Sequence, residues 1–285
     1  MLSSTLGAPG DHHLVVISDI DLDHVAVATE RQADAWPRLV GDLSGAWISG
    51  GESVGFHAAQ VGYANGMKVE VLEPHLVEQN DFLRRFLDAS GPGPHHLTFK
   101  VADIREALAT VEQTGLTPVG VDLRDAQWQE AFLHPKEARG VVVQLAQSGG
   151  SWESPPPPEL PSPAQAAPAT LDHVTHVVAD LDDGAALFRD LLGGRQVAEG
   201  PVEGGRFIDL AWPGGGSIRL VAPTADDDGT SPWAEWLDGR PGRIHHLAFT
   251  VVDPAAVPDA IPTRDDSWVV PPERNLGVRL VLRGP

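Results

Sequence analysis

The chain has 285 residues, with 40 acidic and 20 basic side chains and a formal net charge of −20 at pH 7. This charge argues against unaided binding to nucleic acid or to an anionic membrane surface, because both partners require clustered Lys and Arg. The absence of cysteine excludes disulfides, zinc–thiolate sites and cysteine nucleophiles. No apolar run approaches the ~20 residues of a membrane span. We expect a cytoplasmic protein without a signal peptide.

Two short motifs occur twice in the sequence. LDHV at residues 22–25 returns at 171–174, and HHL at residues 95–97 returns at 245–247. The spacing between the two motifs is almost the same in each half. Chance does not readily produce two matched motifs at matched spacing, so the chain carries an internal duplication.

A segment rich in Pro, Ser and Ala separates the two halves. It covers residues 149–170, and its prolines stiffen the backbone toward an extended conformation. We expect this segment to be a semi-rigid linker between one domain at residues 20–148 and another at residues 171–285.

Each half divides again into two units of the βαβββ type. In the first half, one unit opens with the strand HVAVA, crosses a helix over about residues 32–43 and closes with MKVEVLEP. The next opens with HLTFKV, crosses a helix over residues 103–114 and ends in GVVVQL. Four such units predict an α+β fold. The fourth, after His246, is shorter and interrupted by prolines.

The four principal strands of the first half each carry one polar residue between apolar neighbours. Side chains alternate faces along a strand, so these polar residues must point away from the face that packs on the helices. They are His24, Glu70, His96 and Gln144. Imidazole and carboxylate ligands suit divalent Zn, Co, Ni, Fe or Mn. We therefore predict a metal site that leaves coordination positions open for a substrate with two adjacent oxygens.

The motifs LDHVAVA, KVEVLEP, GPGPHHLTFKVADI and FLHPKEARGVVVQL resemble the vicinal-oxygen-chelate (glyoxalase) superfamily, and most closely the methylmalonyl-CoA epimerases. The resemblance covers residues 20–147 and, more weakly, 170–283. It implies tandem domains, each a cupped mixed β-sheet of two βαβββ modules with helices on its outer face. The metal ligands that it implies are His24, Glu70, His96 and Gln144.

Two departures from the epimerase pattern bear on catalysis. The epimerases usually place an amide at the position of Glu70 and a carboxylate at that of Gln144, so the two are exchanged here. Their proton-abstracting acid in a middle strand of the first module is also missing, since the segment GFHAAQ offers only His57 as a titratable group. Two candidates for the base follow: the imidazole of His57, or Glu70 acting as both ligand and base.

The second half retains the scaffold but not the predicted ligand set. Arg219 and Val281 stand at the positions of Glu70 and Gln144, while His173 and His246 remain. A guanidinium and an alkyl group cannot hold a metal. We expect this domain to be a structural partner of the first; the alternative is that its cup binds an anion through Arg219, with Arg279 nearby.

The function that this pattern favours is that of a metal-dependent isomerase, epimerase or lyase. It would abstract a proton next to a carbonyl of a small molecule with vicinal oxygens, for instance an acyl-CoA, as a monomer or homodimer. One alternative is an extradiol-type dioxygenase, suggested by the tandem-domain length and the two-histidine, one-carboxylate content. Another is a non-catalytic protein that binds a drug or metabolite in the cup.

Overall fold

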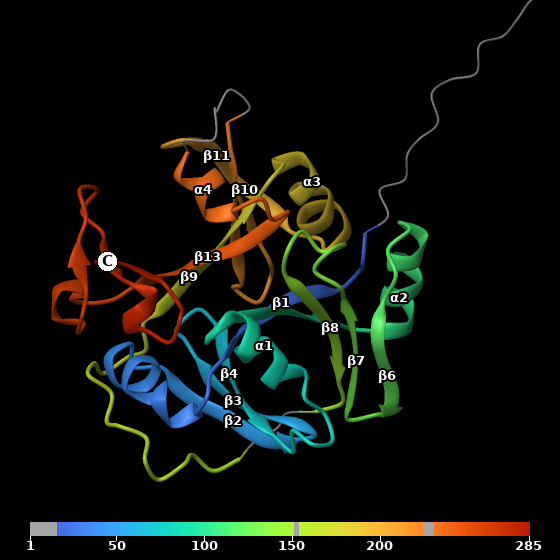
Figure 1. The fold of residues 1–285 in the computed structure, drawn as a ribbon, viewed down its shortest axis with the longest axis horizontal. Helices are drawn as coiled ribbons and strands as arrows, with labels where there is room; N and C mark the ends of the chain where they lie inside the picture. Colours follow the sequence, from blue (N-terminus) through green and yellow to red (C-terminus); the bar gives the residue numbers. More distant parts are fainter. Residues whose placement is uncertain (1–15, 151–153, 225–230) are drawn as a thin grey trace, which may run out of the picture.

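The computed structural model describes residues 16–150, 154–224 and 231–285. Each half of the chain forms one eight-stranded mixed sheet (Figure 1). The strand order is β2-β3-β4-β1-β5-β8-β7-β6 in the first sheet and β10-β11-β12-β9-β13-β16-β15-β14 in the second. Because these orders are equivalent, the duplication seen in the sequence is a duplication of fold, and the predicted tandem α+β class is confirmed.

The strands of the first sheet are β1 Ile20–Ala28, β2 Ala46–Ser53, β3 Gly55–Gly62, β4 Lys68–His75, β5 Gly93–Val101, β6 Val119–Asp125, β7 Trp128–Leu133 and β8 Val142–Ser148. Those of the second sheet are β9 Thr170–Val178, β10 Arg195–Val202, β11 Gly205–Ala211, β12 Ser217–Pro223, β13 Gly242–Thr250, β14 Ile261–Pro262, β15 Trp268–Val270 and β16 Leu280–Arg283. In each sheet the central pair, β1 with β5 and β9 with β13, is antiparallel.

Helix α2, Ile104–Gln113, forms where the sequence predicts it. Its first turn is capped by Asp103, whose carboxylate accepts the backbone N–H groups of Arg105 and Glu106. Its apolar stripe, which includes Leu108 and Val111, is buried in the core.

The other helical connections are less regular than α2. The one predicted over residues 32–43 forms as a 3-10 turn, η1 Gln32–Asp34, and a π-helical segment, η2 Pro37–Asp42. In the second half α3, Leu181–Ala185, continues as the π-helical η3, Ala186–Leu191. The fourth unit contains only short 3-10 turns, η4 Pro254–Ala256 and η5 Pro272–Arg274, because its prolines cannot donate helical hydrogen bonds.

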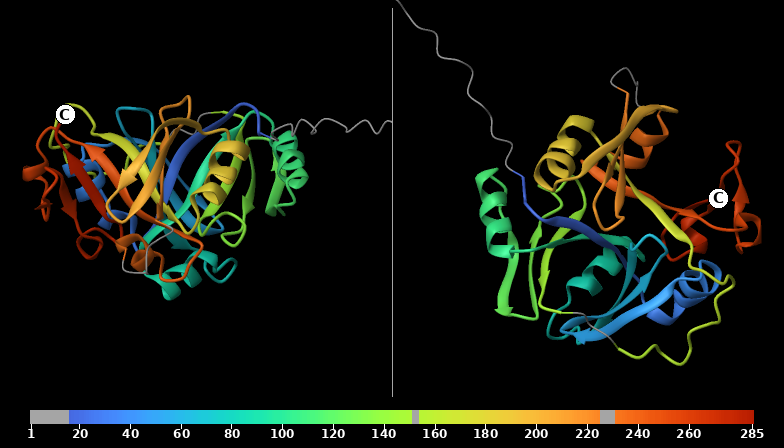
Figure 2. Two further views of the ribbon diagram at one scale, coloured as in Figure 1. Left: turned by 90° about the horizontal axis from the view of Figure 1, so that it is seen from above. Right: turned by 180° about the vertical axis from the view of Figure 1, so that it is seen from behind.

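The two faces of each sheet have different partners. On one face of each sheet the apolar strand residues join one core that spans both halves, in which Phe99 packs on Trp212 and Tyr63 on Phe249. Two further helices, α1 Phe82–Ser90 and α4 Pro232–Leu237, pack on the opposite face of the first and second sheet respectively. We call this opposite face the cup; Figure 2 shows the two sheets from further directions.

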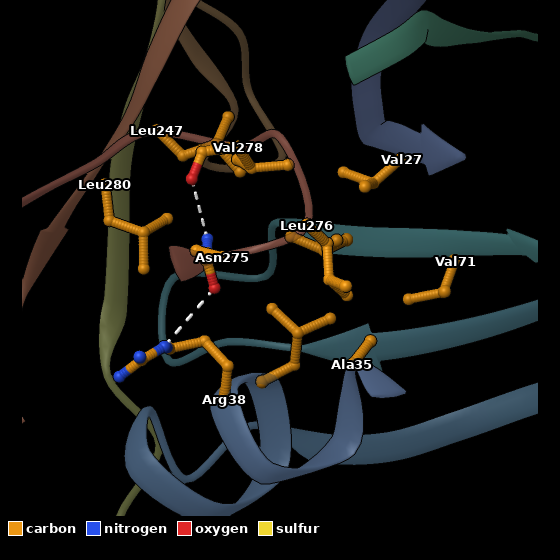
Figure 3. A pocket seen from close by; sticks show the side chains of 11 residues that line it. Val27, Ala35, Arg38, Val71, Leu247, Asn275, Leu276, Val278 and Leu280 are labelled. Atoms are coloured by element: carbon orange, nitrogen blue, oxygen red, sulfur yellow. Dashed lines mark hydrogen bonds between the residues drawn. The ribbon is translucent and has the colours of Figure 1, made fainter. Parts of the chain in front are cut away.

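The domains meet through apolar contacts and several polar links, one of which lies beside the pocket in Figure 3. Side chains of the first half, such as Val27 and Val71, face Leu276 of the second half across a narrow apolar pocket. Beside it, the Arg38 Nε donates to Asn275 Oδ1 at 3.3 Å. The buried link fixes the position of η2 against the second domain.

The described part of the predicted linker runs along the first domain. The Trp47 Nε1 donates to the carbonyl of Ser154 at 2.8 Å, and the backbone N–H of Ala169 donates to Leu43 O at 3.0 Å. Residues 151–153 of this segment lie outside the described residues. Within the ranges that the structure describes, no helix is both long and apolar enough to span a membrane.

Backbone contacts between glycines hold the domains close together. Gly140 has a φ of +85°, and a Cβ built on it would lie 1.9 Å from the carbonyl oxygen of Gly242 in the second domain. Gly115 has nearly the same φ, +83°, but a Cβ there would meet nothing within 4 Å. The two positions therefore separate the cost of backbone conformation from the cost of domain contact.

We predict that G115A costs about 1 kcal/mol of unfolding free energy, through its left-handed backbone alone. G140A should cost about 1–3 kcal/mol more, because its Cβ must push the domains apart. Chemical denaturation of the two variants measures the difference. Equal destabilisation would contradict a tight contact at residue 140.

Candidate metal centre

The predicted ligands come from four neighbouring strands at the centre of the first sheet. The strands β4, β1, β5 and β8 are adjacent, and Ala26 of β1 stands opposite Glu70 on one side and His96 on the other. The small side chain of Ala26 leaves room in the cup between them. All four predicted residues point into the cup, as the alternation of the strands requires.

Two imidazoles converge on one carboxylate oxygen. The Nε2 atom of His24 lies 3.4 Å from Glu70 Oε2, and the Nε2 atom of His96 lies 3.7 Å from the same oxygen. The three residues are buried, with 0%, 8% and 6% of the surface of His24, Glu70 and His96 exposed. Within the described part of the chain, neither Nε2 atom has a hydrogen-bond partner.

These distances fit a shared ion better than direct hydrogen bonds. Two ligands bound at about 2.1 Å with tetrahedral angles are about 3.4 Å apart, whereas a hydrogen bond to nitrogen is shorter, about 2.9 Å. A buried nitrogen without a partner is also costly. His24, Glu70 and His96 therefore form a donor set that suits a divalent transition metal.

Gln144 lies beside this cluster and is held by two hydrogen bonds. Its Oε1 accepts from the Thr98 hydroxyl at 2.6 Å, and its Nε2 donates to Glu130 Oε2 at 2.7 Å. Only 6% of its surface is exposed. The amide oxygen of Gln144 is a candidate fourth ligand, and Glu130 is a carboxylate that the sequence analysis missed.

A second layer of contacts orients the two histidines. Asp23 Oδ2 lies 2.8 Å from the Nδ1 atom of His24, and Lys68 forms an ion pair with the same carboxylate. A histidine that donates its Nδ1–H in this way presents the Nε2 lone pair to a metal. The sequence signal for Asp23 was the Asp-His pair inside the repeated LDHV motif.

His95 lies in the cup, on the same side of the sheet as His96. A register shift between β1 and β5 leaves it out of the strand pairing, so both His95 and His96 reach the same side of the sheet. The Nδ1 atoms of the two residues are 2.8 Å apart, and the ring of His95 packs on Phe86 of α1. His95 thus orients His96 as Asp23 orients His24.

The charges within the cluster are strongly coupled. Burial alone would lower the pKa of His24, but the carboxylates of Glu70 and Asp23 outweigh it and raise that pKa to about 9. Burial would likewise raise the pKa of Glu70, but His24 and His96 lower it to about 2. The pKa of His96 is lowered well below its ordinary value by burial and by neighbouring His95. Without a metal, His24 and Glu70 form an ion pair beside a neutral His96.

His57 does not lie with this cluster. It shares the core face of β3 with Ala59, on the side of the sheet opposite Glu70. Its ring stacks on His75 with centroids 3.9 Å apart, and its Nε2 lies 3.5 Å from Glu52. We therefore do not propose His57 as the base.

The corresponding position in the second cup carries the opposite charge. The guanidinium of Arg219 makes two hydrogen bonds to Asp209, at 2.7 and 2.8 Å. Burial, together with the charge of Arg219, lowers the pKa of His173 to about 4. Among the described residues, the second half holds no group of three His, Asp or Glu that could bind a metal.

Both halves match the same family description in comparisons with known proteins. The glyoxalase/bleomycin resistance protein/dioxygenase superfamily is matched by residues 23–132 with one family model and by residues 170–282 with another. The two matches cover more than half of the chain. The protein belongs to this superfamily. No curated protein matches the sequence.

Several solved structures are similar to one half of the chain or to both. A hypothetical protein from Bacillus halodurans C-125 is 28% identical over 47% of this chain and 99% of its own, with a TM-score of 0.41. Methylmalonyl-CoA epimerase from Mycobacterium tuberculosis is 22% identical over 47% and 91%, with a TM-score of 0.42. A variant of 4-hydroxymandelate synthase from Streptomyces coelicolor is 15% identical over 93% of both chains, with a TM-score of 0.62. This last likeness shows that the tandem fold is shared.

We predict one tightly bound divalent ion per chain, held by the first cup. H24A should abolish this binding, because it removes one of three converging ligands, whereas H173A, the matched change in the second cup, should leave it intact. Elemental analysis after dialysis against Zn²⁺ or Co²⁺ measures the stoichiometry. Equal metal content in both variants would show that the ion is bound elsewhere.

Metal binding should release a proton from His24. Since the pKa of this residue is about 9 without metal, binding at pH 7.5 should release about one proton per ion, and the apparent affinity should rise about tenfold per pH unit up to about pH 9. Calorimetry in buffers of different ionisation enthalpy measures the number of protons.

The stability of the metal-free chain should fall as the pH rises, whereas its affinity for metal should rise. A raised pKa for His24 stabilises the fold fully below its unfolded value of about 6.5, and this stabilisation is lost as the pH rises through about 9. E70Q should reduce both the proton release and this loss. A melting temperature of the metal-free protein that does not change between pH 6.5 and 9 would contradict the ion pair.

Proposed function

We propose that the protein is a metal-dependent enzyme that removes a proton from carbon next to a carbonyl group. The observation that carries this proposal is the convergence of His24 and His96 on Glu70 Oε2, in a cup that also contains a further carboxylate, Glu130. The superfamily membership supports it. The proposed reaction class is isomerisation or epimerisation, with a related lyase reaction open to the same chemistry.

His24, Glu70 and His96 would hold the metal, with Gln144 as the fourth ligand. A bound divalent ion would supply Lewis-acid stabilisation of the negative charge that develops on the carbonyl oxygen. The surrounding residues fix the ligands: Gln60 donates to Glu70 Oε1 at 3.1 Å, which leaves Oε2 directed at the two imidazoles. Because both oxygens of Glu70 are engaged in this way, we assign it as a ligand and not as the base.

Glu130 is the candidate base. Its Oε2 accepts hydrogen bonds from Gln144 Nε2 and Trp128 Nε1, both at 2.7 Å, and this fixes the carboxylate next to Gln144, the candidate fourth ligand. Its Oε1 accepts no hydrogen bond from the residues that the structure describes and is the atom we expect to take the proton. The carbon–hydrogen bond would break, its electron pair would pass toward the carbonyl, and Glu130 would return the proton or exchange it with solvent.

The position of Glu130 agrees with the exchange of ligands noted in the sequence. The epimerase resemblance implies a carboxylate ligand from the second module and an acid in a middle strand of the first. This chain has its carboxylate ligand, Glu70, in the first module and Glu130 in β7, a middle strand of the second. The two modules are related by an approximate twofold axis. Exchanging the roles of the modules about this axis accounts for the new position of the carboxylate ligand and for that of the candidate base.

A cation on the cup face of β5 suits an anionic substrate. The Lys100 Nζ lies 3.8 Å from the ring centroid of Trp128. Burial lowers the pKa of Lys100 to about 8, so it is mostly protonated at neutral pH. We therefore propose a substrate with vicinal oxygens and a negative charge, such as a carboxylated acyl thioester of the acyl-CoA class.

E130Q should keep its metal but lower the rate of proton exchange by about 100-fold or more, because a general base contributes about that factor. The assay is solvent deuterium incorporation into malonyl- or methylmalonyl-CoA, followed by mass spectrometry with the metal-loaded protein. The control is H57Q, which alters the other base suggested by the sequence and lies on the opposite face of the sheet.

Full exchange in E130Q together with loss in H57Q would reverse the assignment of the base.

The alternative function is an extradiol-type dioxygenase, favoured by the two-histidine, one-carboxylate set, which is also a ligand pattern of non-haem iron. Oxygen consumption by the Fe²⁺-loaded protein with a catechol, without deuterium exchange, would establish that alternative. Ligand affinity that is unchanged in metal-free protein would favour a binding protein.

A further inference from the structure

The cup of the second domain has the same framework as the first but a different set of polar groups. His173 and His246 face one another with ring centroids 6.0 Å apart, as His24 and His96 do at 5.9 Å. In place of the carboxylate of the first cup there is a guanidinium. This cup therefore offers hydrogen-bond donors where the first offers metal ligands.

The positive charge of Arg219 in this cup is neutralised by a neighbouring carboxylate. Asp209 on β11 stands opposite Arg219 on β12, and the bidentate contact between them neutralises the guanidinium. The sequence suggested Arg219 as the residue that would hold an anion. The pairing with Asp209 makes it unsuited to that role.

Two other arginines surround the indole of Trp236 on α4. The guanidinium carbon of Arg243 lies 4.1 Å from the ring centroid, and that of Arg279 lies 5.7 Å from it. Neither forms an ion pair or hydrogen bond with any of the residues that the structure describes, although the chain has twice as many acidic as basic residues. His245 packs on the same indole, with ring centroids 4.8 Å apart.

The electrostatic potential around the indole of Trp236 is positive. Burial lowers the pKa of His245 to about 3, and the charges of Arg279 and Arg243 add to the shift. The pKa of His246 is lowered well below its ordinary value by burial and by His245, with Arg279 among the further causes. Both histidines are therefore neutral at physiological pH, and both ring nitrogens of His246 are already hydrogen-bonded, to Thr175 and to His245.

Buried donors in this cup lack acceptors. Trp236 Nε1 and Arg279 Nε are both shielded from solvent and have no hydrogen-bond partner among the residues that the structure describes. Each of these groups can only donate, and a buried unpaired donor is costly. The first cup shows the same signature at its two unpaired histidine nitrogens, where the missing partner is a cation. Here the missing partner must be an acceptor.

We propose that the second cup binds the oxyanion group of a small molecule, a carboxylate or a phosphate, between Arg243, Arg279 and the Nε1–H of Trp236. The two guanidiniums supply charge-assisted hydrogen bonds, and the indole supplies a flat apolar wall as well as a donor. This site is separate from the proposed metal centre and does not depend on the reaction proposed for it.

Titration calorimetry of the full-length protein with inorganic phosphate and, separately, with succinate tests the proposal and distinguishes the two sources of oxyanion. At least one of the two should bind with one site per chain. R279Q and W236F should each weaken that binding about tenfold or more, since each removes a donor to an anion. Higher salt should also weaken it.

R206Q is the matched control. Arg206 is exposed and lies on the core-facing side of β11, opposite Ala222, so its loss should leave binding unchanged. H24A, which removes the metal ligand of the first cup, should leave it unchanged as well. The melting temperature and the metal content of R279Q and W236F check that both variants are folded.

Three results would overturn the proposal. The first is an absence of binding by both probes up to millimolar concentration. The second is equal binding by the wild type, R279Q and W236F. The third is equal weakening by R206Q, which would indicate a general effect of net charge. Loss of anion binding in H24A would instead place the anion at the metal of the first cup, so failure of this proposal is distinguishable from failure of the proposed enzyme function.

Discussion

Two imidazole nitrogens and one carboxylate oxygen, buried together and without partners other than each other, set the constraint on which the first domain depends. Such an arrangement is stable only if a proton or a cation lies among the three groups, because burial penalises unpaired charges and lone pairs. The strands that carry them, β4, β1 and β5, are adjacent at the centre of the sheet. Asp23 and His95 then fix the direction in which each imidazole points.

The second cup has the same scaffold as the first, but the side chain at one equivalent position carries the opposite charge. Glu70 in the first sheet and Arg219 in the second occupy equivalent strands. The carboxylates of Glu70 and Asp23 raise the pKa of His24 against the effect of burial, whereas burial, together with the charge of Arg219, lowers that of His173. A carboxylate among imidazoles favours a cation. A guanidinium among imidazoles excludes one, and the remaining donors favour an anion. The two halves of the duplication thus carry different sets of polar groups on the same fold.

The two domains are nevertheless one structural unit. Their apolar sheet faces form a single core, and close backbone contacts such as Gly140 with Gly242 leave no space for side chains between them. The fourth unit lacks a full helix, and η2 of the first domain packs against it, with Arg38 bound to Asn275. Each domain covers apolar surface that the other would expose, so the second domain is needed for stability whatever its cup binds.

The sequence alone determined the duplication, the α+β class and which residues of β1, β4, β5 and β8 face the cup, because strand alternation has a period of two and a buried face tolerates no slip. It also determined that Arg219 stands in the second half where the first half has Glu70. Only the tertiary structure decided the rest. His95 enters the cup because of a register shift, His57 leaves it because β3 places its imidazole on the core face, and Glu130 reaches Gln144 through strand pairing between β7 and β8. Bulges and contacts between strands distant in sequence have no local signal in the chain, since they arise from how the sheet as a whole is assembled.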